Sequence, residues 1–575
     1  MLFLLSLLWF IRETKAILFW LYLWQLKEYH IGRFLDHFRT GKGKQLIFNK
    51  LLILKIFLIP IFLCGFFLFS FKVLPPPVFS QNLIFIFKLF VGIPFLVLIL
   101  YIFEAVHVSF GFFQRKLKKP VWTLKTILLI SVAVILEILF VFALFLYLRD
   151  EWGQINFTLG TFYLLLFDIL TPVITSAIVL IFQPLAVLSR NQIIRKAKKK
   201  RAQFKDLIVI GITGSYGKTS TKEFLATILS EKFKVLKTAK HQNSEVGVSL
   251  CILNDLKPEH EIFIVEMGAY NRGGIKLLCD IIKPKIGVLT GINEQHMATF
   301  GSLENIIKAK YELIESLPRS ESESSLLRGL PENGLAIFNG DNDYCYELYK
   351  KTKKPKKVYS LQSTISNLPV DLYTSSIAVN REFLSFKVID KNGESAIFKA
   401  NLLGEQNISN ILASAVCAKE LGMTLEEITK ACQKIESWQG GVELKKGING
   451  LNIIDATYSA NPDGVISHLD YLKIWPGKKV IIMPCLIELG KVSKRIHKEI
   501  GKKIGEVCDL SIITTREHFQ EIGEGATEKG LKGENILFIE NPKEIFEKIK
   551  NFCSHGDVVL LESRMPSQLI NLLIP

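Results

Sequence analysis

The sequence is poor in cysteine and contains no Cys-x-x-Cys pair. Its nine cysteines are scattered and odd in number, and eight of them follow residue 250. These features exclude a zinc site built on paired cysteines and a small disulfide-bonded secreted domain. They predict free, buried thiols in a reducing compartment.

Acidic residues are scarce in the first part of the chain. Residues 1–205 contain 25 Lys and Arg but only 8 Asp and Glu, whereas residues 206–575 contain 46 of each kind. A nucleic-acid-binding domain would keep its excess basic charge on the soluble part. Here the excess lies between apolar stretches, which is typical of membrane boundaries. The charge pattern therefore predicts a lipid bilayer and no nucleic acid as partner.

Long apolar runs fill the first 205 residues. Four of them reach the length of about 20 residues that a helix needs to cross hydrocarbon, at 51–72, 82–106, 126–148 and 160–188. A fifth run, at 2–25, is interrupted by Arg12, Glu13 and Lys15, and fits either a spanning helix or an interfacial hairpin. We predict an α-helical membrane domain at 1–205 with about five helices.

The segments between these runs alternate in basic charge. Six Lys and Arg lie in 26–50 and five in 113–125, but 73–81 has none. Six of the seven residues in 195–201 are basic, which predicts a topological anchor or a site for anionic lipid. The positive-inside rule places the basic segments, and everything after residue 188, in the cytoplasm. The predicted location is the cytoplasmic membrane, with the later domains in the cytoplasm.

Three acidic residues lie in or near the apolar runs, namely Glu104, Glu137 and Asp168. Ionisable groups are costly at such positions and are often functional. The alternatives are pairing, for Glu137 with Lys88, or a place beside a wet groove.

A continuous apolar run followed by a glycine-rich loop opens the soluble part. Leu207–Ile212 suits a buried parallel strand, and a helical pattern covers 221–232. In this setting a loop can hold phosphates with its backbone N–H groups, while a lysine reaches the terminal phosphates and a threonine binds Mg²⁺. The predicted phosphate loop consists of Thr213, Gly214, Ser215, Tyr216, Gly217, Lys218, Thr219 and Ser220.

Strands and helices alternate through the rest of the chain, which predicts an α/β fold with parallel sheets. One series belongs to a predicted domain at 206–437 and a second to a domain at 438–575. Residues 357–402 differ, because short alternating strands with turns predict a β insertion. The predicted strands lie at 261–266, 286–290, 336–339, 451–455, 479–483, 510–514, 536–539 and 557–561.

A carboxylate and a histidine are placed to act near the phosphate loop. Glu266 ends a predicted strand, and open α/β sheets bind ligands at that end of their strands. Together with His296 it would supply ligands for a hard cation beside ATP.

Five segments of the soluble part occur in an order that resembles the Mur ligases, a family of ATP-dependent amide-forming enzymes. They are the phosphate loop, Glu266-Met-Gly268, Thr290 to His296, Ala309-Lys310-Tyr-Glu312 and Gly404 to Asn410. The resemblance covers 206–575. It implies a P-loop ATP-binding domain followed by a Rossmann-like C-terminal domain, with ATP and Mg²⁺ as cofactors.

The resemblance also implies roles for single residues. The catalytic residues are Lys218, Lys310 and His296, with Lys310 carbamylated. One Mg²⁺ is bound by Thr219 and Glu266, and a second Mg²⁺ is bound by His296. The nucleotide is bound by the phosphate loop, Asn407 and Asp455. The substrates are bound by Asn243, Ser244, Tyr458 and Asn461.

The implied reaction is the activation of a carboxylate as an acyl phosphate, with release of ADP, followed by attack of an amine. Asp455 to Asp463 and Ile487-Glu488-Leu-Gly490 resemble the branch that adds D-alanyl-D-alanine to UDP-N-acetylmuramoyl-tripeptide in peptidoglycan precursor synthesis. The alternatives are a ligase of the poly-γ-glutamate type and a membrane-tethered regulatory ATP-binding pseudoenzyme.

Two features depart from the family pattern. Gly441 stands where an arginine that contacts the nucleotide phosphates is expected. Moreover, the phosphate loop begins within 25 residues of the last apolar run, so a UDP-binding domain does not fit between them. We therefore expect a muramoyl-peptide-like acceptor, either nucleotide-linked or lipid-linked. Residues 1–205 would position it.

Overall fold

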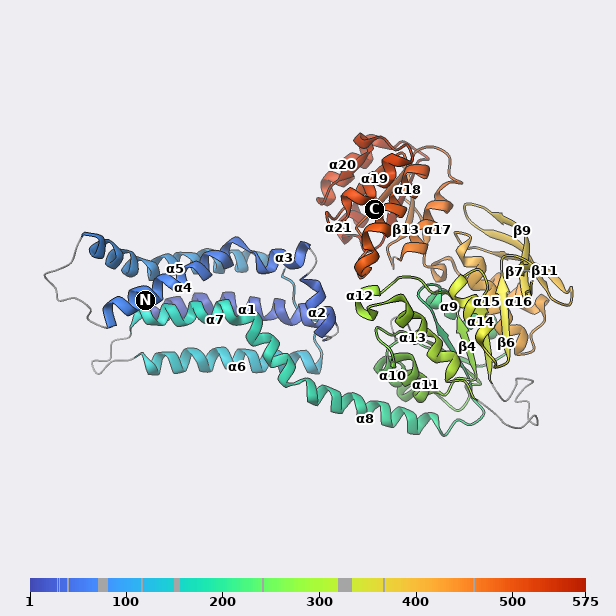
Figure 1. Cartoon of the computed structure of the whole chain (residues 1–575), viewed down its shortest axis with the longest axis horizontal. Helices are drawn as coiled ribbons and strands as arrows, with labels where there is room; N and C mark the ends of the chain where they lie inside the picture. The colour runs from blue at the N-terminus through green and yellow to red at the C-terminus, as the bar shows by residue number, and fades with distance from the viewer. Residues whose placement is uncertain are drawn as a thin grey trace. The chain divides into compact units, whose positions relative to one another are not determined.

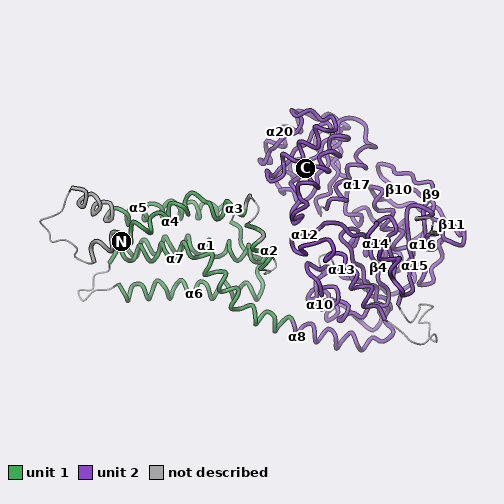
Figure 2. The backbone as a smooth tube through the Cα atoms, in the orientation of Figure 1, with its two compact units in different colours: residues 1–190 green, residues 191–575 purple. Residues whose placement is uncertain are grey.

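The computed structural model describes residues 1–27, 29, 31–38, 41–70, 81–114, 117–148, 156–239, 242–318, 334–365, 368–458 and 461–574. The chain forms two compact units, Met1–Arg190 and Asn191–Pro575 (Figure 2). The described part of unit 1 is helical, whereas unit 2 contains the β-sheets.

Unit 1 is built from helices, and the long ones run alongside one another (Figure 1). They are α1 (Leu2–Leu26), α2 (Ile31–His37), α3 (Gly41–Ile47), α4 (Lys50–Ser70), α5 (Gln81–Phe113), α6 (Leu124–Tyr147) and α7 (Phe157–Ile181), and α8 (Gln183–Arg201) begins here and ends in unit 2. Because α1 is unbroken, the run at 2–25 is a single helix and not a hairpin. The connections 73–80 and 149–155 lie outside the described residues.

Four helical stretches of the described chain are long and apolar enough to cross a membrane. They are Gly43–Cys64, Gly92–Phe113, Leu124–Tyr147 and Phe157–Arg201, and they correspond to the four uninterrupted apolar runs. Large apolar side chains such as Phe103, Leu124 and Phe142 point outward from these helices. Charged side chains lie inside instead, so the usual arrangement of a water-soluble bundle is reversed.

Buried charges join four helices inside unit 1. Lys55 Nζ of α4 lies 2.6 Å from Glu104 Oε2 of α5 and 2.8 Å from Asp168 Oδ2 of α7. Arg12 of α1 pairs with Asp168 and with its neighbour Glu13. Glu104 and Asp168 are therefore ion-paired, with partners that the sequence did not indicate.

Glu137 of α6 is fully buried and differs from these two residues. Its Oε2 accepts a hydrogen bond of 3.4 Å from Thr14, and its Oε1 has no hydrogen-bond partner. The side chain of Lys88, the partner considered for it, lies outside the described part of the chain.

A nine-stranded sheet forms the first α/β part of unit 2, residues 208–432. Its strand order is β11-β10-β9-β6-β5-β4-β1-β3-β2, and β2, β3, β1, β4, β5 and β6 are parallel. The strands are β1 (Ile208–Thr213), β2 (Val235–Lys237), β3 (Ile262–Glu266), β4 (Ile286–Leu289), β5 (Leu335–Asn339), β6 (Lys356–Ser360), β9 (Leu372–Val379), β10 (Leu384–Asp390) and β11 (Ser395–Ala400), while β7 (Thr364–Ile365) and β8 (Leu368–Pro369) form a separate pair.

Three of the strands in 357–402, β9, β10 and β11, extend this sheet at one edge. β9 pairs in parallel with β6, and β10 pairs antiparallel with both β9 and β11. The alternating pattern recognised in the sequence is thus an antiparallel edge of the main sheet, with one face of β10 buried and the other half-buried.

Helices cover both faces of the nine-stranded sheet because its central strands bury both sides. In β1, Ile208, Ile210 and Ile212 belong to one hydrophobic core and Val209 to the other, which explains the uninterrupted apolar run. The helices of this part are α9 (Lys218–Leu229), α10 (Glu245–Asp255), α11 (Gly274–Ile282), α12 (Met297–Phe300), α13 (Leu303–Glu315), α14 (Asp343–Lys351), α15 (Gln406–Glu420) and α16 (Leu425–Cys432).

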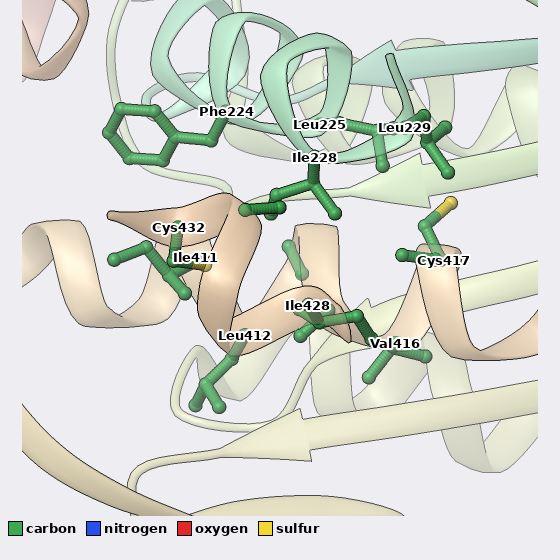
Figure 3. Close-up of a cluster of buried hydrophobic side chains, with 14 of the residues drawn as sticks. Phe224, Leu225, Ile228, Leu229, Ile411, Leu412, Val416, Cys417, Ile428 and Cys432 are labelled. Carbon is green, nitrogen blue, oxygen red and sulfur yellow. The ribbon is translucent and has the colours of Figure 1, made fainter. Parts of the chain in front are cut away.

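The helix that follows the phosphate loop is held by apolar packing. Leu225, Ile228 and Leu229 of α9 face Ile411 of α15 and Ile428 of α16, and all five side chains are buried (Figure 3). This packing fixes the N-terminus of α9, and with it the loop that precedes the helix.

A six-stranded sheet forms the second α/β part, residues 443–573, in the order β12-β13-β17-β14-β15-β16. All its strands are parallel except the edge strand β12. The α/β fold with parallel sheets is confirmed. Its elements are β12 (Glu443–Lys446), β13 (Asn452–Ala456), α17 (Pro462–Leu472), β14 (Lys479–Met483), α18 (Ser493–Val507), β15 (Leu510–Ile513), α19 (Phe519–Glu528), β16 (Ile536–Phe538), α20 (Pro542–Phe552), β17 (Val558–Glu562), α21 (Ser567–Leu573) and the 3₁₀ turns η2 (Ser437–Gly440), η3 (Ile448–Gly450), η4 (Gly490–Val492) and η5 (Gly533–Asn535).

Candidate active site

The predicted phosphate loop connects β1 to α9 and depends on two glycines. Gly217 has φ +76° and stands directly before the helix. At Gly214 an added Cβ would lie 2.2 Å from Thr290 Oγ1, so no other residue fits without movement. The loop therefore presents its backbone and the N-terminus of α9, as an anion site requires.

Neighbouring segments brace the loop. Thr213 Oγ1 donates to Met267 O at 3.0 Å, and Ser215 Oγ accepts from Asn293 N at 3.1 Å. The hydroxyl of Tyr216 accepts from Asn342 Nδ2 at 3.3 Å. These side chains hold the loop in shape, a role that the sequence pattern alone did not assign to them.

The side chain of Lys218 folds back over the phosphate loop. Its Nζ donates to Gly214 O at 2.8 Å and to Ser215 O at 3.2 Å. Burial lowers the pKa of Lys218, and the nearby carboxylate of Glu266 opposes that shift. The ammonium thus lies where the phosphates of a nucleotide held by the loop would come.

Glu266 lies at the C-terminal end of β3 and faces the loop. Its two carboxylate oxygens accept from Thr219 Oγ1 at 3.0 Å and from Asn243 Nδ2 at 3.1 Å. Burial alone would raise the pKa of Glu266. The charges of Lys218 and Lys222, together with the hydrogen bonds from Asn243 and Thr219, outweigh burial and hold that pKa below its usual range, so the group is an anion at neutral pH.

Lys222 is a fully buried cation that the sequence analysis missed. Its Nζ lies 3.4 Å from Glu266 Oε2 and 3.2 Å from Glu223 Oε1. It follows Lys218 by four residues, which places both on one face of α9. That spacing is the signal that could have revealed it.

His296 stands immediately before α12 with φ +64°. Its Nδ1 lies 2.5 Å from Glu488 Oε2 of the second α/β part. Burial keeps the pKa of His296 below its ordinary value, Glu488 acts against that shift, and the charges of Lys310 and Lys218 reinforce it.

Lys310 of α13 is buried in the same region. Burial, reinforced by the charge of Lys218, lowers its pKa to about 7. Near neutral pH a large part of this amine is therefore uncharged, and only an uncharged amine can react with CO₂ to form a carbamate.

A cavity of about 200 Å³ opens beside the start of α9. It is lined by Thr219, Ser220, Glu223, Trp438, Gln439, Gly441, Glu443, Asp455, Thr457 and Tyr458. Asp455 binds Lys445 at 2.6 Å and Thr457 Oγ1 at 2.6 Å. Burial alone would raise the pKa of Asp455, but these bonds outweigh it and hold that pKa below its usual value.

Gly441 lies on the wall of this cavity, in the left-handed conformation with φ +78°. No heavy atom lies within 4 Å of the position that its Cβ would occupy. The expected arginine is thus replaced by open space, at a backbone angle that strains any side chain.

Three predicted site residues hold the surrounding structure in place. Asn407 is buried, donates to Leu403 O and accepts from Asn410, behind the cavity-lining turn. Ser244 caps α10 by accepting from Gly247 N, and Asn461 caps α17 by accepting from Gly464 N. Their predicted contacts with adenine or substrates stay predictions.

The donor set fits Mg²⁺ bound together with a nucleotide. Among the described residues, no three His, Cys, Asp or Glu side chains gather into a metal cluster. Such a cluster is not required, because Mg²⁺ at a nucleotide takes one or two protein ligands and fills its other positions with phosphate oxygens and water. Thr219, Glu266 and His296 offer those ligands next to Lys218.

Comparison with known families and proteins points to one group. The profile of the Mur ligase middle domain matches residues 212–418, and that of the Mur ligase glutamate ligase domain matches residues 442–564. Together they cover more than half of the chain.

Relatives and solved structures carry names from the same group. A UDP-N-acetylmuramoyl-tripeptide–D-alanyl-D-alanine ligase from Bacillus subtilis is 28% identical over 62% of this chain and 72% of its own length. The enzyme of that name from Escherichia coli is 29% identical over 51% and 61%. The chain thus spans less than two thirds of the latter.

Two crystal structures match about two thirds of the chain in fold and, weakly, in sequence. One is of MurF from Acinetobacter baumannii, with TM-score 0.58 and 25% identity over 67% of this chain and 80% of that one. The other is of MurF ligase from Thermotoga maritima in complex with ADP, with TM-score 0.54 and 26% identity over 67% and 83%.

Proposed function

The chain belongs to the Mur ligase family, and from that membership we propose that it is an ATP-dependent amide ligase of peptidoglycan precursor synthesis that works at a membrane. It activates a carboxylate of a muramoyl-peptide-like acceptor as an acyl phosphate, with release of ADP. The amine of the donor then displaces phosphate and forms the amide.

One observation carries this proposal: the ammonium of Lys218 is the common neighbour of three other groups. Burial makes the largest contribution to the pKa of Glu266, of His296 and of Lys310, and the charge of Lys218 acts to lower all three. The phosphate loop thus brings together four groups: the ammonium of Lys218, the carboxylate of Glu266, the imidazole of His296 and the amine of Lys310. Such fixed charges can stabilise the charge that develops in phosphoryl transfer.

The individual groups have distinct tasks in this proposal. Lys218 turns from its own loop carbonyls to the terminal phosphates, and the loop holds the others. Thr219 and Glu266 bind one Mg²⁺ and His296 binds a second, and the two ions supply positive charge beside the phosphates. Lys310, once carbamylated, becomes an anion and no longer repels the metal. Asp455 and Tyr458, on the cavity wall, receive the nucleoside and the amine donor.

D-Alanyl-D-alanine is the proposed donor. The relatives are named for this donor, and the Asp455 to Asp463 and Glu488-Leu-Gly490 segments resemble that branch of the family. For the membrane, the support is the set of four apolar helical stretches and the basic residues between them. A lipid-linked acceptor would lie close to these apolar helices and basic residues, and residues 1–205 would position it.

A screen of donors against acceptors tests the proposal. The full chain in lipid nanodiscs is given ATP with UDP-linked or lipid-linked muramoyl tripeptide, and with D-alanyl-D-alanine or glutamate. We expect phosphate release with D-alanyl-D-alanine and none in the Lys218→Ala variant. Release with glutamate alone would indicate a poly-γ-glutamate-type ligase, and ATP binding without any amide product would indicate a regulatory pseudoenzyme.

A further inference from the structure

A single loop of the first α/β part meets the second α/β part at three places. Asn293 Nδ2 donates to Asp463 Oδ2 at 2.8 Å. Glu294 Oε1 pairs with Arg495 Nη2 at 2.8 Å. His296 Nδ1 lies 2.5 Å from Glu488 Oε2. Because one of these three residues is a predicted metal ligand, contact between the two parts and the metal site share one loop.

The backbone holds Glu488 at this place. Its carbonyl accepts a hydrogen bond of 3.1 Å from Ala298 N, just after His296. A Cβ at Gly490 would lie only 3.3 Å from the same nitrogen, so the backbone at Gly490 is in close contact with the backbone at Ala298. Glu488 itself has φ +65°, an angle that residues other than glycine rarely adopt. The side chain is therefore presented by a fixed and strained turn.

The chemistry of the pair decides which imidazole nitrogen can serve a metal. An ionised carboxylate only accepts hydrogen bonds, so the short contact with an ionised Glu488 requires the proton on Nδ1 of His296. Nε2 is then left without a proton and can bind a cation. The ring of Tyr270 packs edge-on against the imidazole, with centroids 5.1 Å apart, and limits its rotation.

We propose that Glu488 is a positioning residue: it holds His296 with Nε2 toward the second divalent cation, so that this cation's site is complete only when the two α/β parts are in contact. The inference rests on the proposed function and deepens it. Carboxylates that fix a metal-binding histidine in this way raise metal affinity by about 10- to 100-fold.

In this arrangement, metal binding is coupled to contact between the two α/β parts. Since Glu488 and His296 lie on different parts, contact between the parts strengthens metal binding, and metal binding strengthens the contact by the same factor. The metal would then be held firmly only in the arrangement that shields an acyl phosphate from water. Substrate activation and water exclusion become linked through one ion pair.

The test uses Mn²⁺ as a paramagnetic probe, bound to the full-length protein in detergent with a non-hydrolysable ATP analogue. Electron paramagnetic resonance counts the bound Mn²⁺ ions and gives their affinities without any turnover. The variants are Glu488→Ala, which removes the carboxylate, and Glu488→Gln, whose amide oxygen can still accept from Nδ1. The matched control is Arg495→Ala, which breaks the neighbouring ion pair to Glu294 and leaves His296 untouched.

We expect two Mn²⁺ sites in the wild type. Glu488→Ala should weaken the second site by about 10- to 100-fold, and Glu488→Gln should weaken it less. Arg495→Ala should leave it within about twofold, because the exposed ion pair to Glu294 contributes little to the contact between the parts. The first site, at Glu266 and Thr219, should stay unchanged in every variant, which also shows that the variants are folded.

Two results would overturn the inference alone. If Glu488→Ala left the second site unchanged, the carboxylate would have no positioning role. If it tightened that site, the pair would be holding His296 away from the metal. In both cases the ligase proposal stands, provided that the wild type releases phosphate. A wild type that binds no Mn²⁺ with the nucleotide would overturn the inference and the proposed function together.

Discussion

At the scale of single residues, the buried lysines of the site determine how the protein responds to pH. Lys218 and Lys310 lie close enough for the charge of the first to lower the pKa of the second. Two cations at short range in a buried site repel each other, and loss of one proton relieves that repulsion. Burial, with the charge of Lys218, lowers the pKa of Lys310 to about 7.

The pKa of Lys310 predicts a pH dependence of stability. Between pH 7 and 10.5 an unfolded lysine keeps a proton that the folded protein has released, so the free energy of unfolding rises with pH across that window. Urea unfolding in CO₂-free buffer at several pH values measures it. The Lys310→Met variant lacks this contribution, and its deficit relative to wild type should grow with pH. A deficit that stays constant would contradict the assigned pKa.

The sequence predicted the residues of the loop better than their partners across the fold. The phosphate loop, Glu266, His296 and Lys310 stand in local patterns that any reader of the chain can find. Glu488 was noticed only as part of a motif, because its contact with His296 spans 192 residues and depends on a left-handed turn. Lys222 was missed because a lysine on a helix normally points into water.

At the scale of elements, α8 is fixed to unit 2 by its last residue. Arg201 donates to three backbone carbonyls, at Ile282 (2.9 Å), Phe204 (2.7 Å) and Leu207 (3.3 Å). Ile194 and Ala197 of the same helix are buried in a hydrophobic core of unit 2. In the basic segment 195–201, Arg201 therefore has a structural role, whereas other basic residues of the segment are exposed.

Removing that side chain should loosen α8. Arg201→Ala leaves buried carbonyls without donors, at a cost of about 1–3 kcal/mol each in the worst case, so hydrogen exchange should speed up in α8 and at the end of α11. Lys199→Ala, an exposed neighbour on the same helix, is the matched control and should change little. Equal exchange in the two variants would show that Arg201 does not fix the helix.

The charged cluster of unit 1 gives a second prediction at this scale. Asp168→Asn removes the anion that Lys55 and Arg12 share, and breaking such a buried pair costs about 3–5 kcal/mol. Thermal unfolding in detergent, followed by the fluorescence of Trp9 and Trp24 in α1, measures the loss. The double variant Lys55→Met with Asp168→Leu removes cation and anion together and should recover part of it. No loss in the single variant would contradict the pairing.

Strands were predictable where they are apolar and central, and not where they are short and polar. Leu207–Ile212 predicted β1 because a strand covered on both faces is apolar throughout. The edge strands β2 and β12 were missed, since Val235–Lys237 has three residues and Glu443–Lys446 has three charges. The register that makes β9 to β11 part of the main sheet depends on pairing with β6, which no local pattern encodes.

At the scale of the whole molecule, the chain joins apolar helices to a ligase fold. The four long apolar stretches predict that the full chain stays in the membrane fraction after washing with high salt or at alkaline pH, and leaves it only with detergent. A variant with Lys198 and Lys199 changed to Ala should behave in the same way, because apolar burial and not charge holds the protein. Release of the wild type by salt would contradict a spanning domain.

The central claim is that a nucleotide, divalent cations and a substrate carboxylate meet around the Lys218 loop. The most direct measurement is a structure of the full chain with a non-hydrolysable ATP analogue and Mg²⁺. We predict the carboxylate of Glu266 and Nε2 of His296 at about 2.1 Å from two metal ions on the phosphates, with Lys218 turned away from Gly214 and Ser215. Phosphates outside the loop, or Glu266 and His296 both pointing away from them, would contradict the account.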